Sequence, residues 1–140
     1  MNDDYSISTD KSRLDLTVIH QFLSQESYWA KNMPITLVQK SIDNSICFGL
    51  YAGEQQVGFA RVVTDYTTIA YLADVFVLNE HRGRGLAKRL VQSIIDSPDL
   101  QGLRRWILVT KDAHTLYEQF GFDCPDDPKL YMQRKLIDSY

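Results

Sequence analysis

One segment near the middle of the chain limits its possible folds more than any other. Residues 69–78 are nearly all apolar and contain one carboxylate, Asp74. Such a run is typical of a strand that is covered on both faces, in the centre of a sheet. From Gly85 onward, apolar residues recur at helical spacing with charged residues between them. The segment therefore predicts a strand, a tight loop and an amphipathic helix in direct succession.

The loop has the composition of an anion-binding site. The first N–H groups of a helix have no internal partners, and the helix dipole adds positive charge beside them. Glycines let a bulky phosphate approach the backbone closely. We therefore expect a diphosphate group to bind the loop and first helical turn, which consist of Arg82, Gly83, Arg84, Gly85, Leu86, Ala87 and Lys88.

Two common phosphate-binding loops do not fit this spacing. A P-loop requires a Lys-Ser or Lys-Thr pair after its second glycine, and the loop lacks it. A dinucleotide-binding loop requires a third glycine where Lys88 stands, and it follows the first strand of its sheet. Here the loop follows the third or fourth predicted strand. These two exclusions leave a diphosphate ligand that is bound neither by a P-loop nor by a dinucleotide-binding loop.

The other segments predict a mixed α/β fold. Apolar residues at helical spacing indicate two helices in the first third of the chain. The apolar face of the first consists of Leu14, Val18, Ile19 and Phe22. The second has Pro34 in its first turn, and its apolar face consists of Leu37, Val38 and Ile42. Further strands are predicted at residues 46–51, 57–63, 105–110 and 130–137, and a helix at residues 112–120 that Gly121 closes. The order leaves room for one strand before the first helix. We expect residues 1–140 to form a single α/β domain, a mixed central sheet with helices on both faces.

Composition excludes several classes of function. The formal net charge is -3, whereas nucleic-acid-binding domains usually carry a basic face. No apolar stretch approaches the roughly 20 residues of a membrane span, and the acidic N-terminus does not resemble a signal peptide. Cys47 and Cys124 form neither a zinc pattern nor a disulfide framework, which suits a reducing cytoplasm. His20 and His81 have no ligand partners at metal-binding spacing, so no metal site is predicted.

Two motifs in the chain resemble those of the GNAT superfamily of N-acetyltransferases. The sequence Arg82-x-x-Gly85-x-Ala87 is similar to the family's Gln/Arg-x-x-Gly-x-Gly/Ala signature at the start of a helix. The segment 113–122 looks like its second signature, Ala-x-x-Leu-Tyr-x-x-x-Gly-Phe. Both occur in the expected order, and the resemblance spans roughly residues 46–136. It departs at Thr110, where the family often has an asparagine that contacts the cofactor arm.

The resemblance implies an enzyme that moves the acetyl group of acetyl-CoA to a primary amine by direct attack. The central strand would splay from the next one, and the backbone of Val75, Phe76 and Val77 would pair with the pantetheine arm. The amides of residues 82–87 would bind the pyrophosphate. Tyr117 would donate a hydrogen bond to the departing sulfur; its alternative role is packing.

The sequence says less about which residues bind the amine acceptor. Asp74 is the candidate base, because desolvation in a central strand would raise its pKa; a structural carboxylate is the alternative. Tyr28 and Trp29 lie between the first two helices and either line the acceptor pocket or pack in the core. Arg61, Tyr66 and Tyr71 are weaker candidates of this kind, and His114 either touches the cofactor or is solvated.

Two other functions remain open from the sequence. A GNAT-like domain that holds an acyl-CoA without turnover would be a sensor, although such a module has no need of Tyr117. A helix-turn-helix built on residues 82–96 would bind DNA, which the acidic charge and the buried strand oppose. The amine acceptor is a small molecule or a peptide that the sequence does not identify. Exposed strand edges would permit a homodimer.

Overall fold

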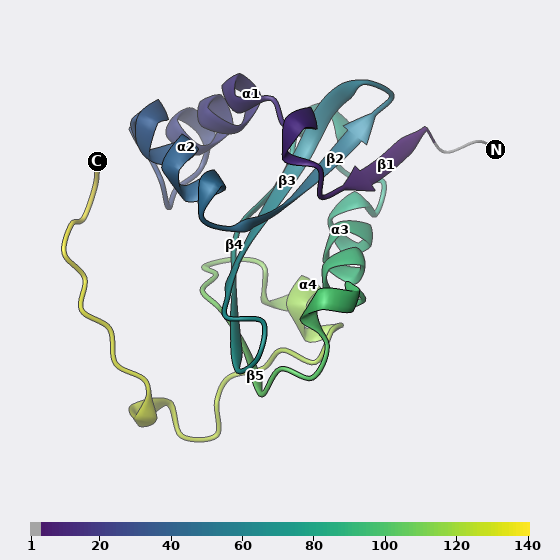
Figure 1. Cartoon of the computed structure of the whole chain (residues 1–140). Coiled ribbons are helices and arrows are strands. Elements are labelled where there is room, and N and C mark those ends of the chain that lie inside the picture. The colour runs from purple at the N-terminus through teal and green to yellow at the C-terminus, as the bar shows by residue number, and fades with distance from the viewer. Residues whose placement is uncertain (1–3) are drawn as a thin grey trace.

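A five-stranded sheet forms the centre of the protein (Figure 1). The computed structural model describes residues 4–140. The strands follow one another across the sheet in chain order, and they are β1 (Tyr5–Ser8), β2 (Ile46–Ala52), β3 (Gln55–Thr64), β4 (Ile69–Val77) and β5 (Arg105–Leu108). β1 to β4 pair antiparallel, whereas β5 pairs parallel to β4. The sheet is therefore mixed, as predicted, and β1 is the strand for which the sequence left room.

Helices cover both faces of this sheet. They are α1 (Leu16–Gln21), α2 (Ile35–Asp43), α3 (Leu86–Ile95) and α4 (His114–Glu118). A π-helical turn, Phe22–Glu26, continues α1, and short 3-10 helices lie at Lys11–Arg13, Asn79–His81, Pro98–Leu100 and Pro128–Leu130. Figure 1 shows α1 and α2 together on one side of the sheet and α3 and α4 on the other. The predicted fold class is confirmed.

Strand alternation divides the core into two layers. Side chains at neighbouring positions of a strand point to opposite faces, and Ala60 packs with Leu90 of α3 while the adjacent Phe59 packs with Ile19 of α1. All three of Ala60, Phe59 and Ile19 are fully buried. β3 thus has an apolar layer on each side, and its neighbour β4 is held in the middle of the fold.

Local signals explain where the helices begin. Asp15 caps α1 by accepting a hydrogen bond from the Val18 N–H. Pro34 precedes α2 as its N-cap, one residue earlier than predicted. Leu37, which was expected on the apolar face, is 41% exposed, because α2 packs on the sheet only through the stripe that holds Val38 and Ile42.

The prediction that residues 69–78 are covered on both faces is wrong for the first half of β4. Ile69 and Tyr71 are 37% and 38% exposed, while the alternating residues Ala70 and Leu72 are buried. The buried pair packs with the α3 and α4 layer. α1 and α2 cover the other face only near the second half of β4, at Phe76.

The predicted last strand, residues 130–137, is also wrong. Only the short helix Pro128–Leu130 occurs there, and every residue from Asp123 to Tyr140 is exposed. Figure 1 shows this C-terminal segment running apart from the sheet. Alternating apolar residues favour a strand, but a strand forms only where another strand supplies its hydrogen bonds. In the described residues 4–140 none does so.

Candidate functional site

The site is centred on the place where β4 and β5 separate. β5 pairs with β4 from Ile69 to Leu72 only, whereas β4 continues to Val77. On the β5 side, the second half of β4 therefore has no strand partner, and this gap in the pairing is called the wedge below. An exposed row of N–H and C=O groups at such a place can pair with an extended ligand.

A β-bulge marks the start of this unpaired half. Phe59 of β3 opposes Phe76, and Arg61 opposes Ala73, so Asp74 and Val75 share the single partner position of Ala60. Asp74 has a φ of 55°, a left-handed conformation that is rare for a residue with a side chain. Bulges bend a strand and re-aim its side chains. This one turns the Asp74 carboxylate toward Arg61 and Trp29.

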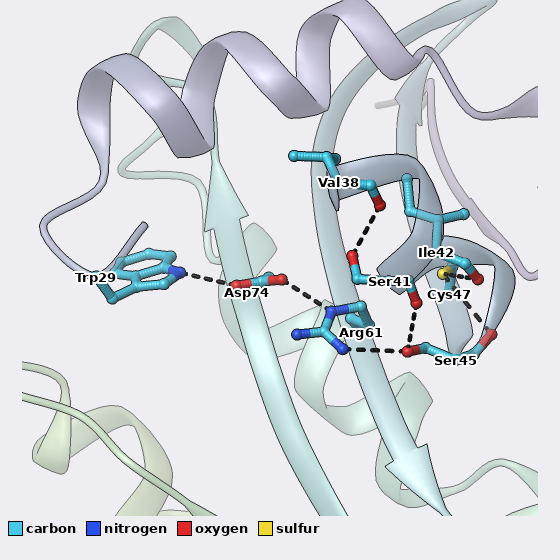
Figure 2. A network of polar contacts seen from close by, with 8 residues as sticks. All are labelled: Trp29, Val38, Ser41, Ile42, Ser45, Cys47, Arg61 and Asp74. Carbon is cyan, nitrogen blue, oxygen red and sulfur yellow. Dashed lines mark hydrogen bonds and ion pairs between the residues drawn. The ribbon is translucent and has the colours of Figure 1, made fainter. Parts of the chain in front are cut away.

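The Asp74 carboxylate has a partner at each oxygen (Figure 2). Trp29 donates its indole N–H to Oδ1 at 2.8 Å, and Arg61 donates its Nε–H to Oδ2 at 2.9 Å. Arg61 also donates from Nη1 to the Ser45 hydroxyl oxygen at 3.1 Å. Asp74 was expected as a desolvated carboxylate in the central strand. It forms an ion pair, and Arg61 is the partner that sequence reasoning did not connect to it.

Tyr28 and Trp29 border the wedge near the Asp74 carboxylate. They are 47% and 41% exposed, so they do not belong to the core. The Tyr28 hydroxyl accepts a hydrogen bond from the Lys111 N–H at 2.8 Å, which ties the loop after α1 to the loop after β5. The Trp29 ring lies 6.3 Å from that of Phe22, which stacks on Phe76 of β4 at 4.0 Å. The aromatic pair is thus connected to both strands that border the wedge.

Tyr117 of α4 is close to the same place. Its side chain is 8% exposed and packs against Phe122 in the α3 and α4 layer. Burial, with smaller contributions from the neighbouring Tyr28 and Asp112, raises the pKa of Tyr117 to about 12. In the chain from residue 4 to 140, no hydrogen bond engages its hydroxyl. A protonated phenol with a free donor therefore stands beside Tyr28.

The loop after β4 supplies an open helix N-terminus. Gly83 and Gly85 have φ values of 81° and 72°, which glycine adopts without strain, and a Cβ at either would meet no atom within 4 Å. Gly85 is the N-cap of α3, and no side chain caps the helix. The first N–H groups of α3 consequently face open space, as an anion-binding helix start requires.

Side chains from two directions hold this loop. Arg82 donates from Nε to the Val77 carbonyl oxygen at 3.0 Å. Arg84 donates to the Tyr5 hydroxyl at 3.0 Å, and that hydroxyl lies 2.7 Å from Nδ1 of His81. Sequence reasoning missed Tyr5. The alternating Tyr-Ser-Ile-Ser of β1 could have indicated a strand there, but not its contact with a loop 79 residues away.

Three other candidates have positions that limit their roles. The Thr110 hydroxyl oxygen accepts from the Ala113 N–H at 3.0 Å and so caps the turn before α4. His114 is exposed, in agreement with the solvated alternative, and the ring of His20 lies 3.0 Å from the Met33 carbonyl oxygen. Residues 4–140 contain no group of three metal-binding side chains. Within the same residues, no helix has the length and apolar character that a membrane crossing demands.

A profile of the Acetyltransferase (GNAT) family matches residues 16–122. The chain belongs to the GNAT family. A candidate acetyltransferase from the fungus Gibberella zeae is 34% identical over 136 residues, with 81% of this chain and 76% of the fungal one covered. The protein is therefore an acyltransferase of the acetyltransferase class, and the resemblance of its two motifs is confirmed.

Solved structures agree with this assignment. A candidate GNAT acetyltransferase from Xanthomonas campestris is 52% identical and superposes with a TM-score of 0.93, covering 96% of this chain and 94% of its own. A GNAT acetyltransferase from Elizabethkingia anophelis, solved with acetyl-CoA bound, has a TM-score of 0.66 at 13% identity, over 89% of this chain and 80% of its own. At this low identity, the likeness to the Elizabethkingia structure shows that the two proteins share a fold.

The shielded phenol of this acetyltransferase can be measured directly. We expect Tyr117→Phe to remove a tyrosine that ionises near pH 12, and not one that ionises near 10.0. The native state then holds this proton more tightly than the unfolded chain does. The resulting stability is complete below about pH 10 and is lost as the pH rises toward 12. Phenolate absorbance of both proteins during alkaline titration gives the result; a difference centred near pH 10 would show that Tyr117 is not shielded.

Proposed function

We propose that this enzyme transfers the acetyl group of acetyl-CoA to a primary amine by direct attack of the amine on the thioester. The observation that carries the proposal is the open wedge between β4 and β5, next to the uncapped N-terminus of α3. An extended arm with a pyrophosphate at its end fits these two neighbouring features. The Elizabethkingia relative, which has the same fold, binds acetyl-CoA.

The backbone of β4 would hold the pantetheine arm. Leu78 donates its N–H to the Val57 carbonyl on the β3 side at 2.8 Å, and successive peptide groups of a strand point to opposite edges. By this alternation Val75 and Val77 face the wedge, and Phe76 faces β3. The Val77 carbonyl oxygen is already bonded by Arg82. We therefore propose Val75 and the Val77 N–H as the main backbone contacts, with Phe76 supporting them from the core.

The pyrophosphate would lie on the amides of residues 82–87. Arg84 and Lys88 are exposed beside them and add positive charge. Leu86, the first residue of α3, is buried against the sheet and Ala87 is small, so the helix start remains accessible to a bulky anion. When bound there, acetyl-CoA supplies the activated acetyl group.

The amine must lose a proton before it attacks. A lysine-like amine with a pKa of about 10.4 needs roughly 4.6 kcal/mol to reach its neutral form at pH 7, whereas an α-amine near 7.8 needs about 1 kcal/mol. Asp74 lies at the start of the wedge, where its negative charge attracts an ammonium group. Its two oxygens each have further lone pairs besides those bonded to Trp29 and Arg61. We propose that Asp74 orients the amine and accepts its proton, directly or through water.

Tyr117 would assist the leaving group. A thiol has a pKa of about 8.5, so its thiolate is too weak a base to take a proton readily from a phenol whose pKa is about 12. The free Tyr117 hydroxyl can instead donate a hydrogen bond to sulfur as negative charge develops there, which stabilises the transition state. Protonation of the thiolate then comes from solvent or from the amine.

The acceptor would enter past Tyr28 and Trp29. Exposed aromatic rings beside a carboxylate suit a cationic amine, since the face of an aromatic ring attracts positive charge. Either a small molecule or a peptide can present such an amine. We also propose that the enzyme works in the cytoplasm, because Cys124 is an exposed free thiol, which a reducing compartment preserves.

Binding of acetyl-CoA is the first test. We expect saturating acetyl-CoA to raise the melting temperature by roughly 5–10 °C, because a ligand at about 100 times its Kd stabilises the native state by about 2.7 kcal/mol. Gly85→Glu should abolish the rise by placing a negative side chain at the helix start. Thermal unfolding is measured with adenosine as the ligand control. If millimolar acetyl-CoA produces no rise, the proposal fails.

Tyr117→Phe tests the leaving-group role. We expect kcat to fall about tenfold or more, since the variant keeps the ring and loses only the donor. Steady-state rates with release of the CoA thiol as readout give the value, and the acetyl-CoA melting shift verifies that binding persists. An unchanged kcat would remove Tyr117 from the mechanism.

The role of Asp74 separates into two parts by comparing variants. Asp74→Asn should lower kcat/KM for the amine about a hundredfold and flatten its dependence on pH, because the amide accepts no proton. Trp29→Phe removes only the hydrogen bond to Oδ1 and should cost far less. Both are measured as pH–rate profiles. Equal losses, with the pH profile unchanged in both variants, would mean that Asp74 only positions Trp29.

A further inference from the structure

The Arg61 guanidinium has unused hydrogen-bond donors beside the Asp74 carboxylate. Arginine carries five N–H donors in a planar fork. Arg61 uses one at Nε for Asp74 and one at Nη1 for Ser45. Within residues 4–140, Nη2 and the second N–H of Nη1 have no partner. Figure 2 shows Nη2 on the side of the guanidinium that faces away from Ser45. These donors are available to an anionic group of a ligand.

Contacts at the end of α2 hold the guanidinium in this orientation. Ser45, which follows α2, accepts the hydrogen bond of Arg61 at 3.1 Å and donates its own hydroxyl to the Ser41 carbonyl oxygen at 2.7 Å (Figure 2). The other end of the fork is fixed by Asp74. A side chain that is already held by several partners loses little freedom when a ligand binds. Arg61 is therefore preorganised to bind one.

The ion pair of Arg61 and Asp74 is mostly buried and has no net charge. Its side chains are 17% and 9% exposed. A plain cationic amine at Asp74 would compete with Arg61 for one carboxylate and leave a positive charge uncompensated, which is costly at a partly buried place. An amine that also carries an anion compensates both members of the pair. The site therefore favours a zwitterion over a plain amine.

The two charges of the pair lie side by side. Nε of Arg61 is 2.9 Å from Oδ2 of Asp74. In an α-amino acid a single carbon separates the ammonium group from the carboxylate, so its charges are also neighbours. A carboxylate matches the planar arginine fork and can accept two parallel hydrogen bonds from it. A peptide would present a neutral carbonyl group there, and a polyamine would present a second cation.

An exposed apolar face adjoins the ion pair. Val63 lies two residues after Arg61 in β3, so both side chains are on one face of the sheet, and Tyr71 is opposite Val63. Val63 and Tyr71 are 42% and 38% exposed, because α1 and α2 pack on the other half of this face. Burial raises the pKa of Tyr71, the Asp74 charge adds to this and the Arg61 charge opposes it, so the ring lies near the ion pair.

We propose that the amine acceptor is a free α-amino acid with an aliphatic or aromatic side chain, whose ammonium group binds Asp74 and whose carboxylate binds Arg61. Its side chain would lie on the face of Val63 and Tyr71. This inference rests on the proposed function, because it names the acceptor class of the same site.

The reaction would also release its product readily. The amino group attacks the thioester carbon, the N–C bond forms and the C–S bond breaks. Of the two protons that the ammonium group loses, one ends on the CoA thiol and the other is released to solvent. The N-acetyl amino acid keeps its carboxylate but has no ammonium group. Asp74 consequently repels the product, whereas it attracted the substrate.

Matched acceptors test the carboxylate contact in the wild-type enzyme. Phenylalanine, phenylalaninamide and phenethylamine share the amine and the ring, but only the first has a carboxylate; leucine, leucinamide and isopentylamine form the aliphatic set. Release of the CoA thiol is followed over a range of pH, so that differences in amine basicity are separated from binding. We expect kcat/KM for each amino acid to exceed that of its two analogues by roughly a hundredfold, because the analogues leave charged donors of Arg61 unpaired.

A pair of arginine variants assigns the effect to Arg61. Arg61→Gln should slow all acceptors, since Asp74 loses its ion-pair partner, but it should also lower the ratio of kcat/KM for phenylalanine to that for phenethylamine at least about tenfold. A purely structural role would leave this ratio unchanged. Arg104→Gln makes the same change at an exposed residue before β5 and should keep the wild-type ratio. The melting shift with acetyl-CoA verifies that each variant folds and binds the cofactor.

Several results would overturn the inference. Equal kcat/KM values within each matched set would mean that the carboxylate is not recognised, while acetyl transfer to amines would stand. If acetyl-CoA binds and no amino acid is acetylated, the acceptor belongs to another class, such as a peptide or a polyamine. A ratio that is the same in Arg61→Gln as in the wild type would assign the carboxylate to another group. If acetyl-CoA does not bind at all, the proposed function fails together with this inference.

Discussion

The separation of β4 from β5 is the constraint on which the rest of the site depends. A central strand normally satisfies its backbone groups on both edges. β4 does so only up to Leu72, and beyond the bulge at Asp74 it stays paired with β3 alone, in a register shifted by one residue. The gap is kept open from both sides. Phe76 is anchored under α1 by its stack on Phe22, while Tyr28 holds the loop after β5 through Lys111.

The same strand connects the chemistry of the two ends of the site. The bulge residue, Asp74, faces the proposed acceptor side. From β4 the chain continues through the 3-10 helix Asn79–His81 to Arg82, which bonds back to the Val77 carbonyl oxygen. Seven residues of backbone, from Val75 to His81, thus separate the Asp74 carboxylate from the glycine loop that begins at Arg82. A short, rigid spacing of this kind fixes where the thioester of a bound cofactor can lie relative to the amine.

Sequence reasoning predicted the parts of the fold that local chemistry determines. The run from residue 69, the glycines at 83 and 85 and the helix after them depend on propensity and backbone freedom, and they are as expected. The ion pair between Arg61 and Asp74 and the contact of Tyr5 with Arg84 depend on which strands become neighbours, which residue patterns do not encode. Residues 130–137 carry a strand pattern, but pairing is a property of the surroundings.

The positions of the two tryptophans have an optical consequence. Trp29 is bonded to Asp74 and partly open to solvent, whereas Trp106 lies half-buried in β5. The chain has no other tryptophan. Its intrinsic tryptophan fluorescence therefore comes from one indole beside Asp74, at the proposed acceptor entrance, and one at the edge of the sheet. Replacing either indole by phenylalanine would leave a single-tryptophan protein whose emission reports on one of these places alone.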